Sequence, residues 1–196
     1  VANCSSIVNL KLHIQDYYDA TTNTMRSVKN NQDGFSAMTE VEDLIIALHQ
    51  AEAPYALVTT TNATLQTDGT LQASFSSLAE GSYYIVVKGS NIVQTWSATP
   101  QTLGIIPFDY DFTTAASKAY GNNMKQLSNG VWAFYSGDIN QDESVDNLDT
   151  ENLFLDIENS NYGQINTDLN GDGSVDNLDT NSFFENIENS IFSSHP

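Results

Sequence analysis

The sequence DINQDESVDNLDT at residues 138–150 returns thirty positions later as DLNGDGSVDNLDT at residues 168–180. Over the longer spans 138–160 and 168–190 the two copies agree at 15 of 23 positions, which chance does not produce. The last part of the chain is therefore expected to fold as two equivalent units.

Each copy carries oxygen-bearing side chains at a fixed spacing. Counted from its first aspartate, it has Asp, Asn, Asp, Ser, Asp and Asp at positions 1, 3, 5, 7, 9 and 12. This is the ligand spacing of a twelve-residue calcium loop, in which position 7 contributes its backbone carbonyl and the other positions contribute side-chain oxygens or a bridging water. The candidate metal ligands are Asp138, Asn140, Asp142, Ser144, Asp146 and Asp149 in the first loop, and Asp168, Asn170, Asp172, Ser174, Asp176 and Asp179 in the second.

The chemistry of these side chains favours calcium over other metals. Ca²⁺ is a hard cation that takes about six to eight oxygen ligands in a tolerant geometry. Neither loop contains His or Cys, which disfavours zinc, and magnesium rarely takes so many protein ligands. Crowded carboxylates repel one another without a cation, so ion binding and folding should be coupled. The sequence predicts two Ca²⁺ ions.

Differences and matches between the copies refine this prediction. Val145 and Val175, both at position 8, are expected to meet in a short two-stranded contact. Glu143 stands at position 6, where the second loop has Gly173. If that position needs a positive φ, Glu143 costs about 1 kcal/mol relative to glycine, which predicts weaker calcium binding by the first loop. Apolar residues after each loop suit the inner face of a helix: Leu148, Leu153, Phe154 and Ile157, matched by Leu178, Phe183, Phe184 and Ile187.

The earlier part of the chain alternates apolar and polar residues in short runs. The first run covers residues 7–18, with Leu10, Leu12 and Ile14 on one face, and residues 44–49 repeat the pattern with Leu44, Ile46 and Leu48. A polar loop is expected before residue 39, a hairpin turn at 67–70 and a short helix around 115–120. Further strands are expected at 82–88, 92–97, 108–112 and 131–135.

Together these patterns predict a mainly β fold in two domains. Residues 1–136 should form an antiparallel β-sandwich, since about seven short strands are separated by turn residues. Residues 137–196 should form a small α domain of two loop–helix, EF-hand-like calcium units.

Charge excludes some functions and marks the C-terminal segment. The net charge is -19, and six basic residues are too few for a nucleic-acid partner, which would need clustered Lys and Arg. Residues 137–196 hold 14 of the 25 acidic residues and none of the basic ones. No apolar run approaches the roughly 18–20 residues that span a bilayer, so membrane insertion is not expected, and the N-terminus lacks a signal-peptide pattern.

No catalytic constellation stands out, and we expect a non-enzymatic protein. His13, His49 and His195 are scattered, with His13 and His49 on the polar faces of their strands, where a surface position is expected. Cys4 has no nearby His and no cysteine partner in the chain. An aromatic platform for sugar is conceivable, although core packing explains these rings better: Tyr17, Tyr18, Tyr83, Tyr84 and Trp96.

Residues 137–190 resemble the dockerin module, a pair of loop–helix calcium units whose best-known members plug secreted enzymes into cohesin domains. Asp149 and Asp179 at position 12, where an ordinary EF-hand has Glu, agree with that family. Positions 10 and 11 hold Asn-Leu pairs where cohesin-docking members show Ser-Thr pairs, so the resemblance implies calcium binding more than cohesin binding. The segment LAEGSYYIVV at 78–87 looks like strands of prealbumin-like or collagen-adhesin B-type sandwiches.

The whole arrangement is similar to C-terminal regions of secreted bacterial surface proteins. That resemblance implies a secreted, extracellular or cell-surface module for adhesion, display or assembly. Two alternatives stay open at this point. One is a protein-docking or self-assembling module with a cohesin-like partner or a filament, and the other is a carbohydrate-binding module with a glycan partner.

Overall fold

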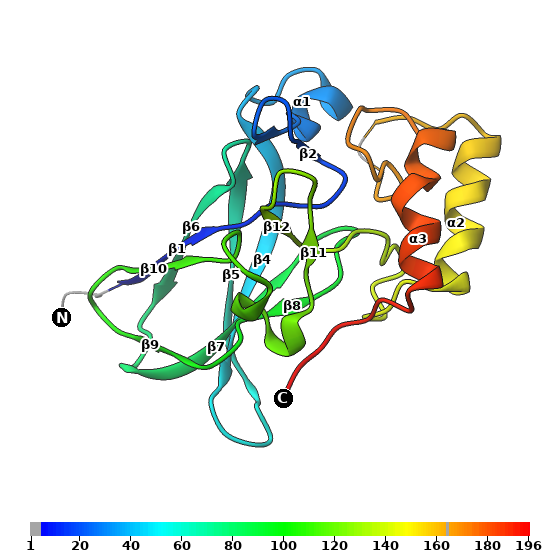
Figure 1. Ribbon diagram of the computed structural model, residues 1–196. Coiled ribbons are helices and arrows are strands. Elements are labelled where there is room, and N and C mark those ends of the chain that lie inside the picture. The colour runs from blue at the N-terminus through cyan, green and yellow to red at the C-terminus, as the bar shows by residue number, and fades with distance from the viewer. Residues whose placement is uncertain (1–4, 164) are drawn as a thin grey trace.

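The computed structural model describes residues 5–163 and 165–196. Figure 1 shows a β-rich body on one side and the helices α2 (Asn147–Glu158) and α3 (Asn181–Glu188) side by side at its flank. None of the described helices is long and apolar enough to cross a membrane.

Two sheets form the β-rich body. The larger sheet has the order β5-β4-β7-β8, with β9 also pairing β7, and the smaller has the order β10-β1-β6. Two further strand pairs, β2 with β3 and β11 with β12, lie outside these sheets. The strands are β1 (Ser5–Lys11), β2 (Tyr18–Asp19), β3 (Thr24–Met25), β4 (Glu40–Gln50), β5 (Leu57–Gln66), β6 (Thr70–Ser76), β7 (Gly81–Lys88), β8 (Thr95–Trp96), β9 (Gln101–Leu103), β10 (Phe108–Asp111), β11 (Lys125–Gln126) and β12 (Trp132–Ala133).

Alternating side chains build the core between the sheets, as the sequence predicted. Leu44, Ile46 and Leu48 of β4 are fully buried, and Leu12 and Ile14 join them from the chain that follows β1. Burial of each such side chain contributes roughly 1.5–3 kcal/mol before the entropy cost of ordering it. The predicted mainly β sandwich is confirmed.

The predicted turn at 67–70 joins β5 to β6, but it does not form a hairpin, because β5 pairs β4 in the larger sheet and β6 pairs β1 in the smaller one. Gly69 has φ +88, and a Cβ there would lie 2.8 Å from the carbonyl oxygen of Leu12 and 2.8 Å from the ring of His13. Asp68 accepts a hydrogen bond from the Thr70 backbone N–H at 2.9 Å. Only glycine fits at Gly69, because both the backbone angle and the close approach exclude a side chain.

Several local expectations are wrong. The sandwich is not wholly antiparallel, since β1 pairs β6 antiparallel but β10 parallel. The helix expected around 115–120 is two 3₁₀ turns, η1 (Ala116–Lys118) and η2 (Tyr120–Asn122). The polar segment before residue 39 contains α1 (Val28–Asp33), whose single buried residue, Val28, gave no visible periodicity.

A second apolar cluster lies among the C-terminal residues. Leu153 of α2 and Phe183 of α3 are fully buried, together with Val145 and Val175 of the two loops and Val93 from the sandwich. A short 3₁₀ segment, η3 (Asn177–Thr180), precedes α3. The division between residues 136 and 137 stays a prediction.

Polar side chains join the helices to the sandwich. Buried Asn186 of α3 donates to Gln15 Oε1 at 3.0 Å and to the Ser136 carbonyl at 2.9 Å. Asp16 accepts hydrogen bonds from the hydroxyls of Ser136 and Ser182, and burial raises the pKa of its carboxyl. These buried contacts fix the helices in one position on the sandwich, because breaking them would leave unpaired polar groups.

Candidate functional site

Both repeats start their helices in the same way. Asp146 at position 9 accepts from the Leu148 N–H at 2.7 Å, and Asp149 at position 12 accepts from the Asp146 N–H at 3.0 Å. The second repeat reproduces this reciprocal cap with Asp176 and Asp179, at 2.8 Å between the Asp176 N–H and Asp179 Oδ2. The aspartates at positions 9 and 12 therefore bind backbone donors that would otherwise lack partners at the start of a helix.

The position 1 carboxylates shape the turns of the loops. Asp138 accepts from the backbone N–H groups of Asp142 and Glu143, at 3.1 and 3.2 Å. In the second loop, Asp168 accepts from the Gly171 and Gly173 N–H groups, both at 2.9 Å. These hydrogen bonds from backbone amides to the position 1 carboxylates hold each loop in a compact form.

The carboxylates at positions 1 and 12 are buried and electrostatically strained. Asp138, Asp149, Asp168 and Asp179 are at most 2% exposed. Burial, followed by repulsion from Asp149, raises the pKa of Asp138 to about 7. Burial also raises the pKa of Asp179 to about 6, with the charges of Asp168 and Asp172 acting in the same direction. The pKa values of Asp149 and Asp168 are raised by burial as well.

Within residues 5–163 and 165–196, no group of three or more His, Cys, Asp or Glu side chains is gathered closely enough to hold a metal ion. The candidate ligands are directed largely at backbone donors: Asp149 Oδ1, for example, accepts from the N–H groups of Ile139 and Asn140 at 2.8 and 2.9 Å. The donor set itself consists of oxygen alone in both loops, and this is the chemistry that Ca²⁺ prefers.

Position 6 has the backbone angle that the sequence comparison anticipated. Glu143 has φ +78 and Gly173 has φ +93, so the first loop carries a side chain in a conformation that favours glycine. The Glu143 carboxylate accepts from Gln94 Nε2 at 3.1 Å and lies 3.6 Å from His195 Nε2. These contacts hold the first loop against the sandwich and the C-terminal segment.

The valines at position 8 do not pair with each other, so that expectation is wrong. The Val145 N–H donates to the Ile191 carbonyl at 2.8 Å, and the Val175 N–H donates to the Asn161 carbonyl at 2.9 Å. Each loop therefore pairs with the segment that follows the helix of the other repeat. The valine side chains do meet in the shared apolar cluster.

Half of the expected inner helix face is exposed. Leu153 and Phe183 are buried and Ile157 and Ile187 partly so, as predicted. The other four expected residues, together with Leu155, are exposed and are called here the helix face; within it the Phe154 and Phe184 rings lie 6.1 Å apart. The helix face comprises Leu148 (67% exposed), Phe154 (44%), Leu155 (48%), Leu178 (58%) and Phe184 (41%).

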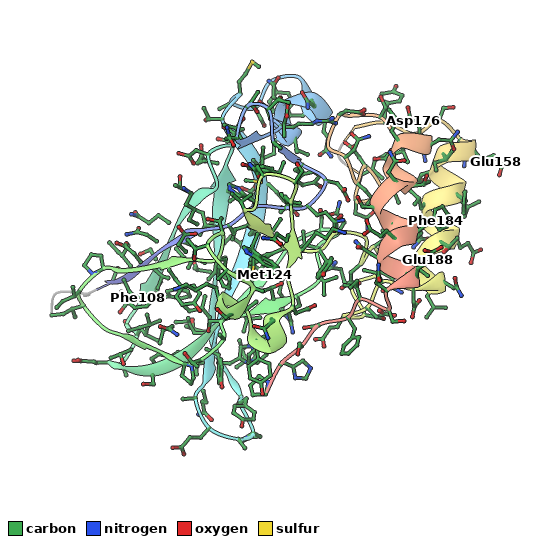
Figure 2. All side chains as sticks on the ribbon, in the orientation of Figure 1. Phe108, Met124, Glu158, Asp176, Phe184 and Glu188 are labelled. Carbon is green, nitrogen blue, oxygen red and sulfur yellow. The ribbon has the colours of Figure 1, made fainter. Side chains whose placement is uncertain are left out.

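Exposed acidic side chains lie on the same two helices as the helix face. Glu151 and Glu158 are exposed on α2, and Glu185 and Glu188 on α3. Figure 2 marks Phe184 with Glu188 on α3 and Glu158 at the end of α2. Lys125 of the sandwich lies 2.5 Å from Glu185, and residues 137–196 contain no basic residue. The helices α2 and α3 therefore expose both apolar and negatively charged side chains.

The structure tests the predicted positions of one histidine and of several aromatic residues. The surface position predicted for His13 is wrong. Its side chain is only 4% exposed and packs against Tyr18, and burial lowers its pKa to about 4. Tyr17, Tyr84 and Trp96 are buried, which confirms core packing and leaves no exposed aromatic platform from these three residues. Cys4 lies outside the described residues.

Comparison with solved structures finds similarity over nearly the whole chain. A chain from a C-terminal interface mutant of the type II Cohesin-X-Dockerin complex of Acetivibrio cellulolyticus matches with a TM-score of 0.53 and 12% identity, covering 93% of this chain and 95% of that one. An N-terminal interface mutant of the complex matches with a TM-score of 0.52, the same identity and the same coverage. No family model and no curated protein matches.

These matches overturn the family assignment made from the sequence. That assignment divided the chain into a dockerin module and a prealbumin-like or collagen-adhesin B-type sandwich. The structural match instead aligns 93% of this chain with a single chain of a cohesin–dockerin complex. The assignment is therefore wrong. At 12% identity the comparison shows a shared, mainly β sandwich fold and does not extend to membership of a family.

Proposed function

We propose that this chain is a non-catalytic protein-docking module that works outside the cell, with the helix face as its contact surface. The observation that carries the proposal is the exposure of five large apolar side chains on α2, η3 and α3. Exposed apolar residues gathered in one place commonly mark protein contacts. The matched chains come from assemblies of one protein module with another, which supports the same function here.

The surroundings of the helix face indicate the chemistry of its partner. Exposed glutamates lie on the same helices as the apolar side chains, and residues 137–196 have no basic residue to balance them. A partner surface that carries apolar side chains together with Lys or Arg would complement these residues, and opposite charges would speed association at low salt.

Calcium binding by the two loops belongs to the same proposal. The ligands would be the twelve oxygen-bearing residues predicted from the repeat, six in each loop. A bound Ca²⁺ would neutralise the buried carboxylates at positions 1 and 12, whose charge is otherwise costly. Extracellular calcium is high enough to fill sites with Kd of about 10⁻⁴–10⁻³ M, whereas cytosolic calcium is not.

Thermal unfolding with and without calcium tests the metal part. Calcium at a hundredfold excess over Kd stabilises by about 2.7 kcal/mol per site, so two sites should raise Tm by roughly 10–20 °C over the value in EDTA. The double variant Asp142→Asn/Asp149→Asn should lose one ion by native mass spectrometry and about half of the shift. An equal Tm in calcium and EDTA would refute calcium binding.

A pair of matched surface variants tests the docking part. Leu148→Ser/Leu178→Ser removes apolar side chains from the helix face, and Ile105→Ser/Ile106→Ser removes similarly exposed ones from the sandwich. The immobilised chain is exposed, in calcium, to the secreted proteins of its source organism, and self-association is followed by sedimentation. Saturable binding should be lost only in the helix-face variant. Equal binding by both variants, or the absence of any partner and of self-association, would contradict the proposal.

A further inference from the structure

The second loop rests on α1 and on Arg26, which lies two residues before it, and the contacts involve its candidate ligands. Arg26 Nη1 donates to the Asn170 carbonyl at 3.0 Å and to Asn170 Oδ1 at 2.9 Å. Gln32 Nε2 donates to Asp168 Oδ2 at 2.9 Å. Figure 1 shows this loop beside α1. Positions 1 and 3 of the second loop are thus held by side chains from the N-terminal part of the chain.

Two glycines allow this close approach. A Cβ on Gly171 would lie 2.5 Å from Val28 Cγ2, and one on Gly173 would lie 2.4 Å from the Asn31 carbonyl oxygen. Asn31 Nδ2 also donates to the Gly171 carbonyl at 2.7 Å. The first loop has Gln141 and Glu143 at these positions and could not occupy the same place, so the two loops differ in their surroundings as well as in sequence.

The Arg26 contact puts a permanent positive charge on a candidate metal ligand. Asn170 Oδ1 is the position 3 oxygen of the second loop, and the guanidinium of Arg26 stays protonated at any ordinary pH. In the part of the chain that the structure describes, no Lys or Arg hydrogen-bonds a candidate ligand of the first loop. Among the described residues, a permanently charged side chain therefore contacts a candidate ligand in the second loop and not in the first.

We infer that Arg26 is a tethered cation that competes with calcium for the second loop and sets the order in which the two loops fill. This rests on the calcium binding proposed above. Ca²⁺ must displace the guanidinium from Asn170 Oδ1, and the charge of Arg26 then repels the ion across a short distance. The first loop, without such a competitor, binds calcium first, which is the reverse of the order predicted from Glu143 alone.

Calorimetric titration of the full chain tests this assignment. In the background Asp142→Asn/Asp149→Asn only the second loop binds, and Arg26→Gln should tighten its calcium affinity about three- to tenfold, because Arg26 is exposed and its charge is partly screened. Arg26→Lys, which keeps the charge, should stay near the starting affinity. Raising the salt should shrink the gain from Arg26→Gln, and a merely structural role would not give that response.

Lys125→Gln is the matched control, since it removes the same charge from a residue paired with Glu185 rather than with the loop. It should leave the affinity unchanged, and an equal gain in this control would overturn the assignment. An unchanged or weaker affinity in Arg26→Gln would overturn it too, and Arg26→Met provides a second measurement should that variant unfold. If the Asp142→Asn/Asp149→Asn protein binds no calcium at all, the proposal that the second loop binds calcium is refuted, and the role of Arg26 is refuted with it.

Discussion

The contact between the second loop and α1 can be tested with two glycine-to-alanine variants that differ in one respect. Gly171 has φ +72 and Gly34, at the end of α1, has φ +76, so alanine is equally unfavourable for the backbone at both. A Cβ on Gly34 would meet nothing within 4 Å, whereas a Cβ on Gly171 would lie 2.5 Å from Val28 Cγ2 and 2.9 Å from the Tyr17 ring. The difference between the variants therefore measures the packing of the loop.

The expected magnitudes follow from these distances. A left-handed backbone angle costs alanine about 1 kcal/mol relative to glycine, which should lower Tm by roughly 2–4 °C in Gly34→Ala. Gly171→Ala carries the same cost plus about 1–3 kcal/mol for forcing a methyl group into a filled contact. The total of about 2–4 kcal/mol should lower Tm by roughly 4–16 °C.

Both variants are compared by thermal and urea unfolding in excess calcium, followed by circular dichroism. A double-mutant cycle adds Val28→Ala, which removes the methyl group nearest the new Cβ. The loss of unfolding free energy in the double variant should be smaller than the sum of the losses in the two single variants, by about 1 kcal/mol or more. If Gly171→Ala and Gly34→Ala lower stability equally and the cycle is additive, the loop does not rest on α1 as described.

Two further perturbations concern buried polar groups. Because burial lowers the pKa of His13 to about 4, from 6.5, the unfolded chain takes up a proton before the folded one, and stability contributed by neutral His13 is lost as pH falls from about 6.5 to 4. Urea unfolding should show this loss, up to about 3 kcal/mol, as the difference between the wild-type and His13→Gln pH profiles, and parallel profiles would rule it out. Asn186→Ala leaves the Gln15 and Ser136 oxygens unpaired and should cost about 2–4 kcal/mol in the same assay. Exposed Asn189→Ala, three residues later, should cost under about 0.5 kcal/mol, and equal losses would count against a buried network.

Local patterns in the sequence predicted most of the large strands. Alternation located β4, β-branched and aromatic residues located β7, and the Asp-Gly turn located the reversal between β5 and β6, because each depends on neighbours in the chain. The parallel pairing of β1 with β10 joins segments about a hundred residues apart, and no local signal reports it. Helix α1 went unrecognised for a related reason: with one buried residue, its position depends on contacts with β4 and the second loop.

The candidate site was predictable in composition but only in part in arrangement. The spacing of aspartates identified both loops, and the positive φ at Glu143 followed from comparison with Gly173. The spacing could not decide which apolar residues of the helices face inward, because α2 carries apolar residues on two sides. Leu153 is buried while Leu155 is 48% exposed, and this difference depends on where α3 packs against α2.

The crossed pairing of the repeats has a consequence for how the duplicated segment can exist. Val145 bonds to the strand-like residue after α3, and Val175 bonds to the corresponding residue after α2. Neither copy contains the backbone partner of its own loop valine. A polypeptide cut between the copies would therefore leave each piece with unpaired backbone groups and only part of the apolar cluster. Each copy therefore depends on the other to fold as described, and a shortened version should recover these pairings only by combining with a second molecule.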